Sequence, residues 1–330
     1  MYLKPSGHIE IIRADGRKLS FDAFHSVEIE RDIFKINSSC KIQIPISSRL
    51  EYKGKGYTES VQTAKQFARG DKISVWLGYG DNLKLEFSGF IYRLNYKTPL
   101  EIECEGYEFL LRSPCETKTW SKTNLKTILE YIIKDTDIVL SDKVPEMNFT
   151  KYIIPANMTK LEALQVVKEK YGIAVFFMEK TLYAGLAYVI DLGTVKYKLG
   201  WNTIKDDELK YRNADDVRLK IKAVWIKPDN TKLEAEVGDP EGSQRTLFFY
   251  NVSSKSELEK LAKEEMKKYK YSGYEGKITT FLQPFAQPGM KGILQDPKYS
   301  EREGTYYITK VKVKSDKGGG HRTVEFTVKL

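Results

Sequence analysis

Apolar residues occupy every second position through much of the stretch 70–111, and this alternation constrains the fold more than any other feature of the sequence. A period of two is that of a β-strand with one face on a hydrophobic core. Polar breaks divide the stretch into three runs, which we expect to be successive antiparallel strands. Gly89 lies within the second run, where a missing side chain indicates a bulge or the close approach of another backbone. The three apolar series are Ile73, Val75 and Leu77, then Leu85, Phe87, Gly89 and Ile91, then Leu100, Ile102 and Cys104.

Nearly all of residues 1–115 reads as strand. Asp15-Gly16 is a strong signal for a two-residue hairpin turn. Residues 49–68 are polar, contain glycine and lack a clear period, so we expect a long loop there. The six or more strands predicted for this part are enough to form a small barrel or sandwich.

The composition changes after Pro114, and residues 116–200 predict a small unit with two helices and a hairpin. Helix caps and turn residues mark where these elements begin and end. The signals are Thr123 or Asn124 as the first helix cap, Thr159 and Glu162 in capping-box spacing, Gly172 as a helix end and Glu179-Lys180 as the hairpin turn.

Residues 201–330 return to strands, with one helix near 256–271 that begins with capping-box spacing between Ser256 and Glu259. A series of features from the N-terminal part is repeated here. In both places a glycine and a lysine two residues later precede a strand, a polar turn, a glycine-led aromatic strand and a last alternating strand. The two series begin at Gly70 and Gly289.

The predicted fold class is therefore α+β but mainly β, with two similar antiparallel β-barrel domains and a small α+β domain between them. We expect the first barrel in residues 1–115, the α+β insert in 116–200, and the second barrel in 201–330, including the helix. A chain of 330 residues is long enough for two or three domains.

The composition is that of an ordinary folded chain, with 41% hydrophobic and 30% charged residues, which argues against disorder. No apolar run approaches the ~18 residues of a membrane helix, so we expect no stable membrane insertion. The N-terminus lacks the layout of a signal peptide, and cytoplasmic synthesis is expected. Cys40, Cys104 and Cys115 form no CxxC pair and are predicted to be buried and free.

No grouping of residues indicates catalysis. The three histidines are isolated, and the sequence has no HExxH, GxSxG or phosphate-binding glycine motif. Glu101, Glu103 and Glu105 share one face of a predicted strand, and solvent exposure, a basic partner surface and catalysis all remain open for them. We expect no enzyme activity, no cofactor, and no catalytic, cofactor-binding or metal-binding residue; the binding residues are not predicted.

Two surface features have competing interpretations. The net charge is +9, and its densest region is the last hairpin, which forms either a solvated face or a surface that contacts phosphates. Tyrosines on alternating strands are explained by cross-strand packing, but an oligomer interface or a sugar-stacking surface would also use them. The residues concerned are Lys310, Lys312, Lys314, Lys317 and Arg322 for the charge, and Tyr79, Tyr92, Tyr107, Tyr306 and Tyr307 for the aromatic rings.

The succession of these elements resembles the central baseplate hub and late-control proteins of contractile phage tails and tail-like particles, and the N-terminal hub part of type VI secretion spike proteins. The resemblance covers nearly the whole chain in the order of its elements. It rests on the pattern of FSGFIYRLNYK and PLEIECEGYEFLL, followed by a tryptophan and the TNLKTILEYII helix.

The resemblance implies a structural hub: a homotrimer whose two barrels per chain form a pseudo-sixfold ring between the tail tube and the central spike. The implied partners are the tube protein, the spike and other baseplate proteins, without specific nucleic-acid recognition. The implied location is the baseplate of a virion tail or tail-like particle, assembled in the cytoplasm of the bacterial host. Because Leu330 follows the last predicted strand directly, we expect the spike to be a separate chain.

Two other functions stay open from the residues alone. The tyrosine content suits a tail protein that binds cell walls or carbohydrate, with possible hydrolase activity. The basic isoelectric point of about 9.1 suits a β-barrel that binds nucleic acid.

Overall fold

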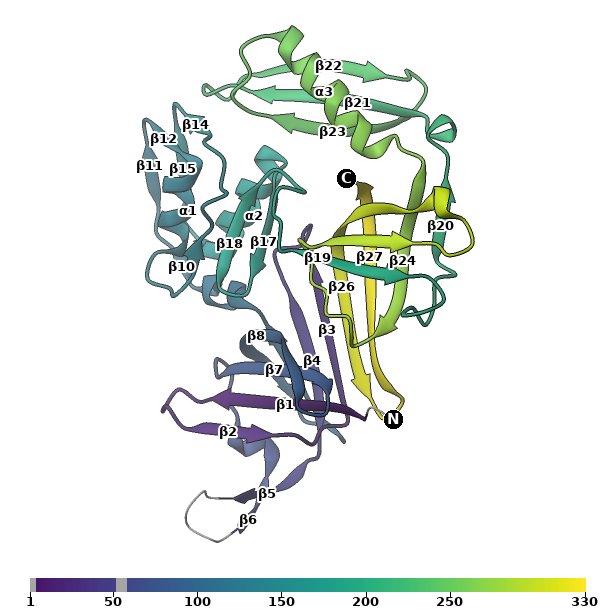
Figure 1. Cartoon of the computed structure of the whole chain (residues 1–330). Helices are drawn as coiled ribbons and strands as arrows, with labels where there is room; N and C mark the ends of the chain where they lie inside the picture. Colours follow the sequence, from purple (N-terminus) through teal and green to yellow (C-terminus); the bar gives the residue numbers. More distant parts are fainter. Residues whose placement is uncertain (1–3, 52–57) are drawn as a thin grey trace.

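The computed structural model describes residues 4–51 and 58–330 (Figure 1). Seven strands from the first third of the chain form an antiparallel array, which we call the N-terminal strand set. In spatial order they are β2 (Lys18–Phe21), β1 (Pro5–Ile12), β7 (Lys72–Tyr79), β8 (Asn82–Asn95), β9 (Leu100–Glu105), β4 (Ser39–Ile44) and β3 (Ser26–Asp32).

Six later strands form the C-terminal strand set, and one of them, β26 (Gly304–Asp316), pairs with β3 in antiparallel fashion. The two sets are thereby joined into one 13-stranded sheet. The mainly β fold class predicted from the sequence is confirmed. In spatial order the second set comprises β19 (Thr194–Lys198), β25 (Lys291–Gln295), β26 (Gly304–Asp316), β27 (Gly319–Lys329), β24 (Gly273–Phe281) and β20 (Leu209–Arg212).

The two strand sets follow the same plan. When β1, β7, β8, β9, β4 and β3 are matched with β19, β25, β26, β27, β24 and β20, both the spatial order and the order along the chain agree. One pairing differs, because β1 is antiparallel to β7 whereas β19 is parallel to β25. The repeat that the sequence indicates only faintly is therefore present in the topology.

The match extends to single hydrogen bonds. Gly70 and Gly289 both have a φ of 93°, a left-handed conformation that favours glycine. The Gly70 N–H donates to the Ile91 carbonyl over 2.9 Å, and the Gly289 N–H donates to the Ile308 carbonyl over the same distance. Both isoleucines donate in return to the residue after the glycine, again over 2.9 Å. Ile91 and Ile308 are therefore equivalent positions.

A second shared detail is a β-bulge directly after these isoleucines. The register of β8 on β9 shifts between Ile91 and Arg93, and that of β26 on β27 shifts between Ile308 and Lys310. The strand glycines do not correspond, because Gly89 lies two residues before its isoleucine and Gly304 lies four before.

Gly89 has the role expected from the sequence. A Cβ atom at this position would lie 2.1 Å from the carbonyl oxygen of Glu105 on β9. The prediction of a close backbone approach is confirmed.

The loop predicted over residues 49–68 is wrong in part. β5 (Ser47–Glu51) and β6 (Thr58–Gln62) pair as an antiparallel hairpin, which is followed by a 3₁₀ turn at Thr63–Gln66. Most side chains of β6 are exposed, so the hairpin lacks the apolar alternation that would reveal it in the sequence. Residues 52–57, also part of the predicted loop, lie outside the described residues.

The middle of the chain contains the predicted helices and hairpin. Asn124 caps α1 (Leu125–Ile133) by accepting from the Thr127 N–H. Thr159 and Glu162 form the predicted capping box of α2 (Lys160–Tyr171), which ends at Gly172 in a left-handed conformation. The strands of this part are β10 (Pro114–Cys115), β11 (Lys118–Trp120), β12 (Thr123–Asn124), β13 (Val139–Leu140), β14 (Asn148–Phe149), β15 (Tyr152–Ile154), β16 (Met158–Thr159), β17 (Ala174–Met178) and β18 (Thr181–Gly185).

A separate three-stranded sheet interrupts the C-terminal strand set between β20 and β24. It consists of β21 (Leu219–Ile226), β22 (Lys232–Gly238) and β23 (Ser243–Phe249), and α3 (Lys255–Tyr269) packs on it. Val224 and Ile226 of β21 join the hydrophobic cluster of the middle part.

The sequence pattern does not distinguish this sheet from the second barrel. The cap predicted for α3 at Ser256 is also wrong. The cap is Ser254, whose hydroxyl accepts from the Glu257 N–H. Both Ser254 and Ser256 are followed three residues later by glutamate, so the sequence leaves two registers open. The domain boundaries at 115 and 200 remain a prediction, although β19 already begins at Thr194.

One hydrophobic cluster extends through both strand sets. It contains Ile9, Ile42 and Ile102 from the first set and Ile278 and Val324 from the second. Because the two sets share this core and a strand pairing, they form one packed body. The three cysteines are buried and free, as predicted.

Glu108 is a buried acid in the 3₁₀ turn that follows β9. Its Oε1 accepts from the backbone N–H groups of Ser38 over 2.8 Å and Gly106 over 2.9 Å. Burial outweighs these bonds and raises the pKa of Glu108 to about 8. The folded chain therefore retains a proton here that the unfolded chain releases near its ordinary pKa of 4.5.

We expect this proton to make stability fall as pH rises. The folded state binds more protons than the unfolded state between about pH 4.5 and 8, so the free energy of unfolding decreases across that window. Glu108→Gln should flatten the decrease, because a neutral amide retains the accepting oxygen. Urea unfolding at pH 5, 6.5 and 8 would measure it, with the exposed Glu130→Gln as a matched control. Parallel pH profiles for Glu108→Gln and the wild type would contradict this assignment.

Candidate functional site

The most extensive polar feature of the fold is one face of the shared sheet, which we call the charged face. Val27, Ile29, Val311 and Val313 point from β3 and β26 into the core, so the residues between them point to the opposite side. The same alternation holds in the neighbouring strands. The charged face consists of Glu101 and Glu103 of β9, Lys41 and Gln43 of β4, Glu28 and Glu30 of β3, Lys310, Lys312 and Lys314 of β26, Thr323 and Glu325 of β27, and Lys277 and Thr279 of β24.

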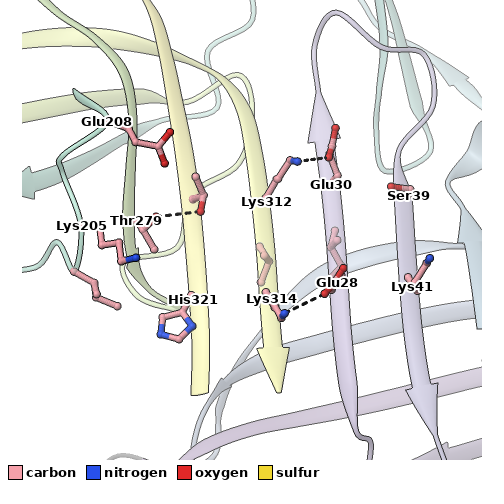
Figure 2. A pocket seen from close by; sticks show the side chains of 14 residues that line it. Glu28, Glu30, Ser39, Lys41, Lys205, Glu208, Thr279, Lys312, Lys314 and His321 are labelled. Atoms are coloured by element: carbon pink, nitrogen blue, oxygen red, sulfur yellow. Dashed lines mark hydrogen bonds and ion pairs between the residues drawn. The ribbon is translucent and has the colours of Figure 1, made fainter. Parts of the chain in front are cut away.

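Ion pairs cross the junction of the two strand sets on this face (Figure 2). Glu30 lies 2.8 Å from the Nζ of Lys310 and 2.9 Å from that of Lys312. Glu28 lies 3.3 Å from the Nζ of Lys314. Opposite charges on paired strands favour this register over its neighbours.

The pKa of Glu30 shows how strongly the neighbouring lysines stabilise its ionised form. Burial alone would raise its pKa, but hydrogen bonds from Lys310, Lys35 and Lys312 outweigh burial and lower the pKa to about 2. The carboxylate therefore stays ionised across the physiological pH range, and the pairing persists with it.

The charged face is hollowed between β24 and β4 by a pocket of about 590 Å³ (Figure 2). Its walls include Glu28 and Glu30 of β3, Lys312 and Lys314 of β26, and His321 of β27. The Thr279 and Thr323 hydroxyls lie 3.2 Å apart and hydrogen-bond each other. The carboxylates of β3 are thus engaged with lysines, and the arrangement is that of an ionic surface.

The glutamates of β9 are not freely solvated side chains, since Glu101 is buried and Glu103 and Glu105 are half-buried. Glu101 is only 4% exposed and lies 2.9 Å from Lys97. Glu103 pairs with Arg93 over 2.7 Å, and Glu105 pairs with Arg112 over 2.5 Å. Basic groups that neutralise all three are supplied by the chain itself.

The last hairpin is not an unpaired basic surface. Lys310 and Lys312 pair with Glu30, and Lys314 pairs with Glu28, so the glutamates of β3 neutralise part of the positive charge of this hairpin. Arg322 has an exposure of 0% and points to the core side of β27, with Val324 and Phe326. The phosphate-contacting interpretation loses its support.

Arg322 belongs to a buried ionic cluster between the two strand sets that sequence reasoning missed. Its guanidinium contacts both carboxylate oxygens of Glu86, at 2.5 and 3.1 Å, and Arg31 lies 3.4 Å from the same carboxylate. Burial lowers the pKa of Arg31, and Glu86 opposes this effect. In the sequence, the alternation of β27 places Arg322 on the same side of the strand as Val324. This pattern could have indicated that Arg322 faces the core. No pattern in the sequence indicated that Glu86 is buried, because the register of β7 on β8 shifts around this residue.

The predicted cross-strand packing of the tyrosines holds for those that are buried. Tyr306 and Tyr307 are 0% and 1% exposed, and Tyr107 packs edge-to-face on Phe90. These rings are not available to stack on a sugar. Among the described residues, the most exposed large rings are instead Tyr96 and Trp201, both 79% exposed.

The described residues show neither a metal site nor a membrane-spanning helix. No group of three or more His, Cys, Asp or Glu residues there could hold a metal ion. No helix in that part of the chain has the length and hydrophobicity needed to cross a membrane.

Comparison with known proteins finds matches among solved structures. No family model matches the sequence, and no curated protein matches it. The tail protein of Neisseria meningitidis MC58 is similar with a TM-score of 0.62 at 12% identity, covering 99% of this chain and 97% of that one.

Two further structures are similar over most of their length. The 43 kDa tail protein of prophage MuSo2 from Shewanella oneidensis gives a TM-score of 0.60 at 14% identity, covering 98% of both chains. The E. coli c3393 protein, a component of the type VI secretion system, gives 0.56 at 10% identity, covering 92% of this chain and 73% of that one. The chain therefore shares its overall fold with phage tail proteins.

Proposed function

We propose that the chain is a structural protein of a contractile tail or tail-like particle, and specifically its baseplate hub. Three copies form a ring with pseudo-sixfold symmetry that joins the tail tube to the central spike. The observation that carries the proposal is the repeat within the chain, in which two strand sets share one order and one pattern of glycine and isoleucine hydrogen bonds.

Symmetry explains why a hub needs such a repeat. A threefold ring offers six similar positions to a sixfold tube only when each chain presents the docking surface twice. The shared hydrophobic cluster and the β3–β26 pairing hold the two surfaces of one chain at a fixed spacing.

The partners follow from this placement. The tube protein binds one side of the ring, and the spike binds the other, with further baseplate proteins around them. The similarity to a type VI secretion component and to the chains of a PdpA–VgrG complex supports a place next to a spike. The protein acts as a non-enzymatic adaptor, in a particle assembled in the cytoplasm of the host bacterium.

Light scattering and negative-stain electron microscopy of the purified chain test the proposal. We expect a ring-shaped particle of three times the 38.0 kDa chain mass, favoured by high concentration or by the tube protein. A chain that stays monomeric at the highest concentration, both alone and with the tube protein, would refute the ring. An image of an assembled particle with this chain outside the tube–spike junction would refute the hub.

A further inference from the structure

The contact between β3 and β26 inside one chain is a template for the contact between chains. We propose that β20 of one copy pairs with the end of β8 of a second copy, in the place that β3 occupies beside β26. This inference rests on the proposed ring and names the surface that closes it.

The equivalence of β8 and β26 fixes one side of the contact. Ile91 and Ile308 are matched by their hydrogen bonds and by the bulge that follows each of them. Counting on from the bulge, Arg93 corresponds to Lys310, and both stand opposite a glutamate on the next strand. Asn95 then corresponds to Lys312.

The equivalence of β20 and β3 fixes the other side. Cys104 stands opposite Ile91, and Cys40 stands opposite Cys104 and Ile29. In the second set Phe326 stands opposite Ile308, and Gly276 stands opposite Phe326 and Leu209. Leu209 therefore corresponds to Ile29, and the next residue, Lys210, corresponds to Glu30.

An ion pair supports this alignment. Glu208 pairs with Lys277 over 2.7 Å. In the first set the corresponding residues are Glu28 and Lys41, which stand opposite each other on β3 and β4.

Both edges are open in the described chain. β20 ends the strand order of the large sheet and pairs there with β24 alone. β8 pairs with β7 only from Asn82 to Phe90, so the same side of residues 92–95 has no strand beside it among those described. Lys312 pairs with Glu30 within one chain, so the template places Asn95 opposite Lys210 of the second copy.

The exposure of the side chain at the end of β8 is consistent with the absence of a neighbouring strand there in the described part of the chain. Tyr96, directly after β8, is 79% exposed. Tyr96 follows Arg93 by three residues, as Val313 follows Lys310, so these two positions correspond. Val313 is 1% exposed because it lies in the junction between the two strand sets. A second copy placed by the template would cover this ring.

The charges make the contact between chains weaker than the one within a chain. The template places Arg93 opposite Arg212, where the chain itself has Lys310 opposite Asp32. Each arginine already has its own carboxylate, since Arg93 pairs with Glu103 and Arg212 with Glu275, both over 2.7 Å. Backbone hydrogen bonds between strands, not ion pairs, therefore supply most of the attraction. The ring should consequently dissociate on dilution.

Disulfide trapping tests the register directly. A chain carrying Asn95→Cys and Lys210→Cys, oxidised at high protein concentration, should shift on a non-reducing gel from one chain mass to a covalent trimer. The matched positive control is Lys312→Cys with Glu30→Cys, which places the same pairing within one chain and should close without a change in mass. The matched negative control is Lys84→Cys with Lys210→Cys, because Lys84 lies on the part of β8 already paired with β7.

Light scattering of the uncrosslinked chain separates the possible failures. A trimer whose Asn95→Cys and Lys210→Cys residues do not link, while the positive control does, overturns the proposed pairing and leaves the ring intact. A monomer at every concentration without links overturns the ring as well. Covalent trimers that form equally well with Lys84→Cys would show random collision and also overturn the pairing.

Discussion

Glu86→Ala is expected to destabilise the fold by about 3–5 kcal/mol, because it leaves the buried Arg322 without its carboxylate. Glu86 is 1% exposed and Arg322 is 0% exposed, so the guanidinium remains buried when its carboxylate is removed. Arg31, which also faces Glu86, would lose its partner at the same time. Urea unfolding followed by circular dichroism measures the loss.

Two companion variants show whether charge is the cause. Lys314→Ala removes an exposed ion pair of the charged face and should cost at most about 1 kcal/mol. The triple variant Glu86→Met with Arg322→Met and Arg31→Met removes all three charges of the cluster and should recover much of the stability that Glu86→Ala loses. A triple variant less stable than Glu86→Ala would show that the loss comes from packing and not from an unpaired charge.

Gly89→Ala is expected to cost about 3 kcal/mol or more and to reduce the yield of soluble chain. The new Cβ would lie 2.1 Å from the carbonyl oxygen of Glu105 and 2.9 Å from its carbon. Both atoms belong to the backbone of β9, so relief requires β8 and β9 to separate where they pair in the middle of the sheet. Chemical unfolding and the soluble fraction on expression are the measurements.

Gly318→Ala is the matched control for this steric argument. It lies in the turn between β26 and β27, where the nearest atom to a new Cβ is the Asp316 Oδ1 at 3.1 Å. A side chain can move aside, so the expected change is within about 0.5 kcal/mol. Equal effects at Gly89 and Gly318 would argue against the clash with β9.

The sequence predicts strands well where one face is buried. In β3, β4, β26 and β27 the alternation of apolar and polar residues matches the two faces of the sheet, and the repeat beginning at Gly70 and Gly289 proves to be structural. The caps at Asn124 and Thr159 are also where short-range signals place them. These successes share a cause, because the information lies within a few residues of chain.

The failures come from contacts between distant residues. The pairing of β3 with β26 joins residues almost 300 positions apart, so no local pattern reveals it. The register shift beside Glu86 moves an acid from the expected outer face to the core. The separate sheet of β21–β23 looks like more of the same barrel, because β21 and β22 alternate as the strands of the large sheet do. For the same reason the charged face becomes visible only when its strands are placed side by side.

The hydrophobic cluster common to both strand sets has a consequence for how the protein melts. Two repeats linked only by a tether would each have their own transition, whereas repeats that share side chains from Ile42 to Val324 lose their packing together. Neither repeat has a stability that can be assigned to it alone. Any substitution at this shared centre is therefore felt by both strand sets of the chain at once.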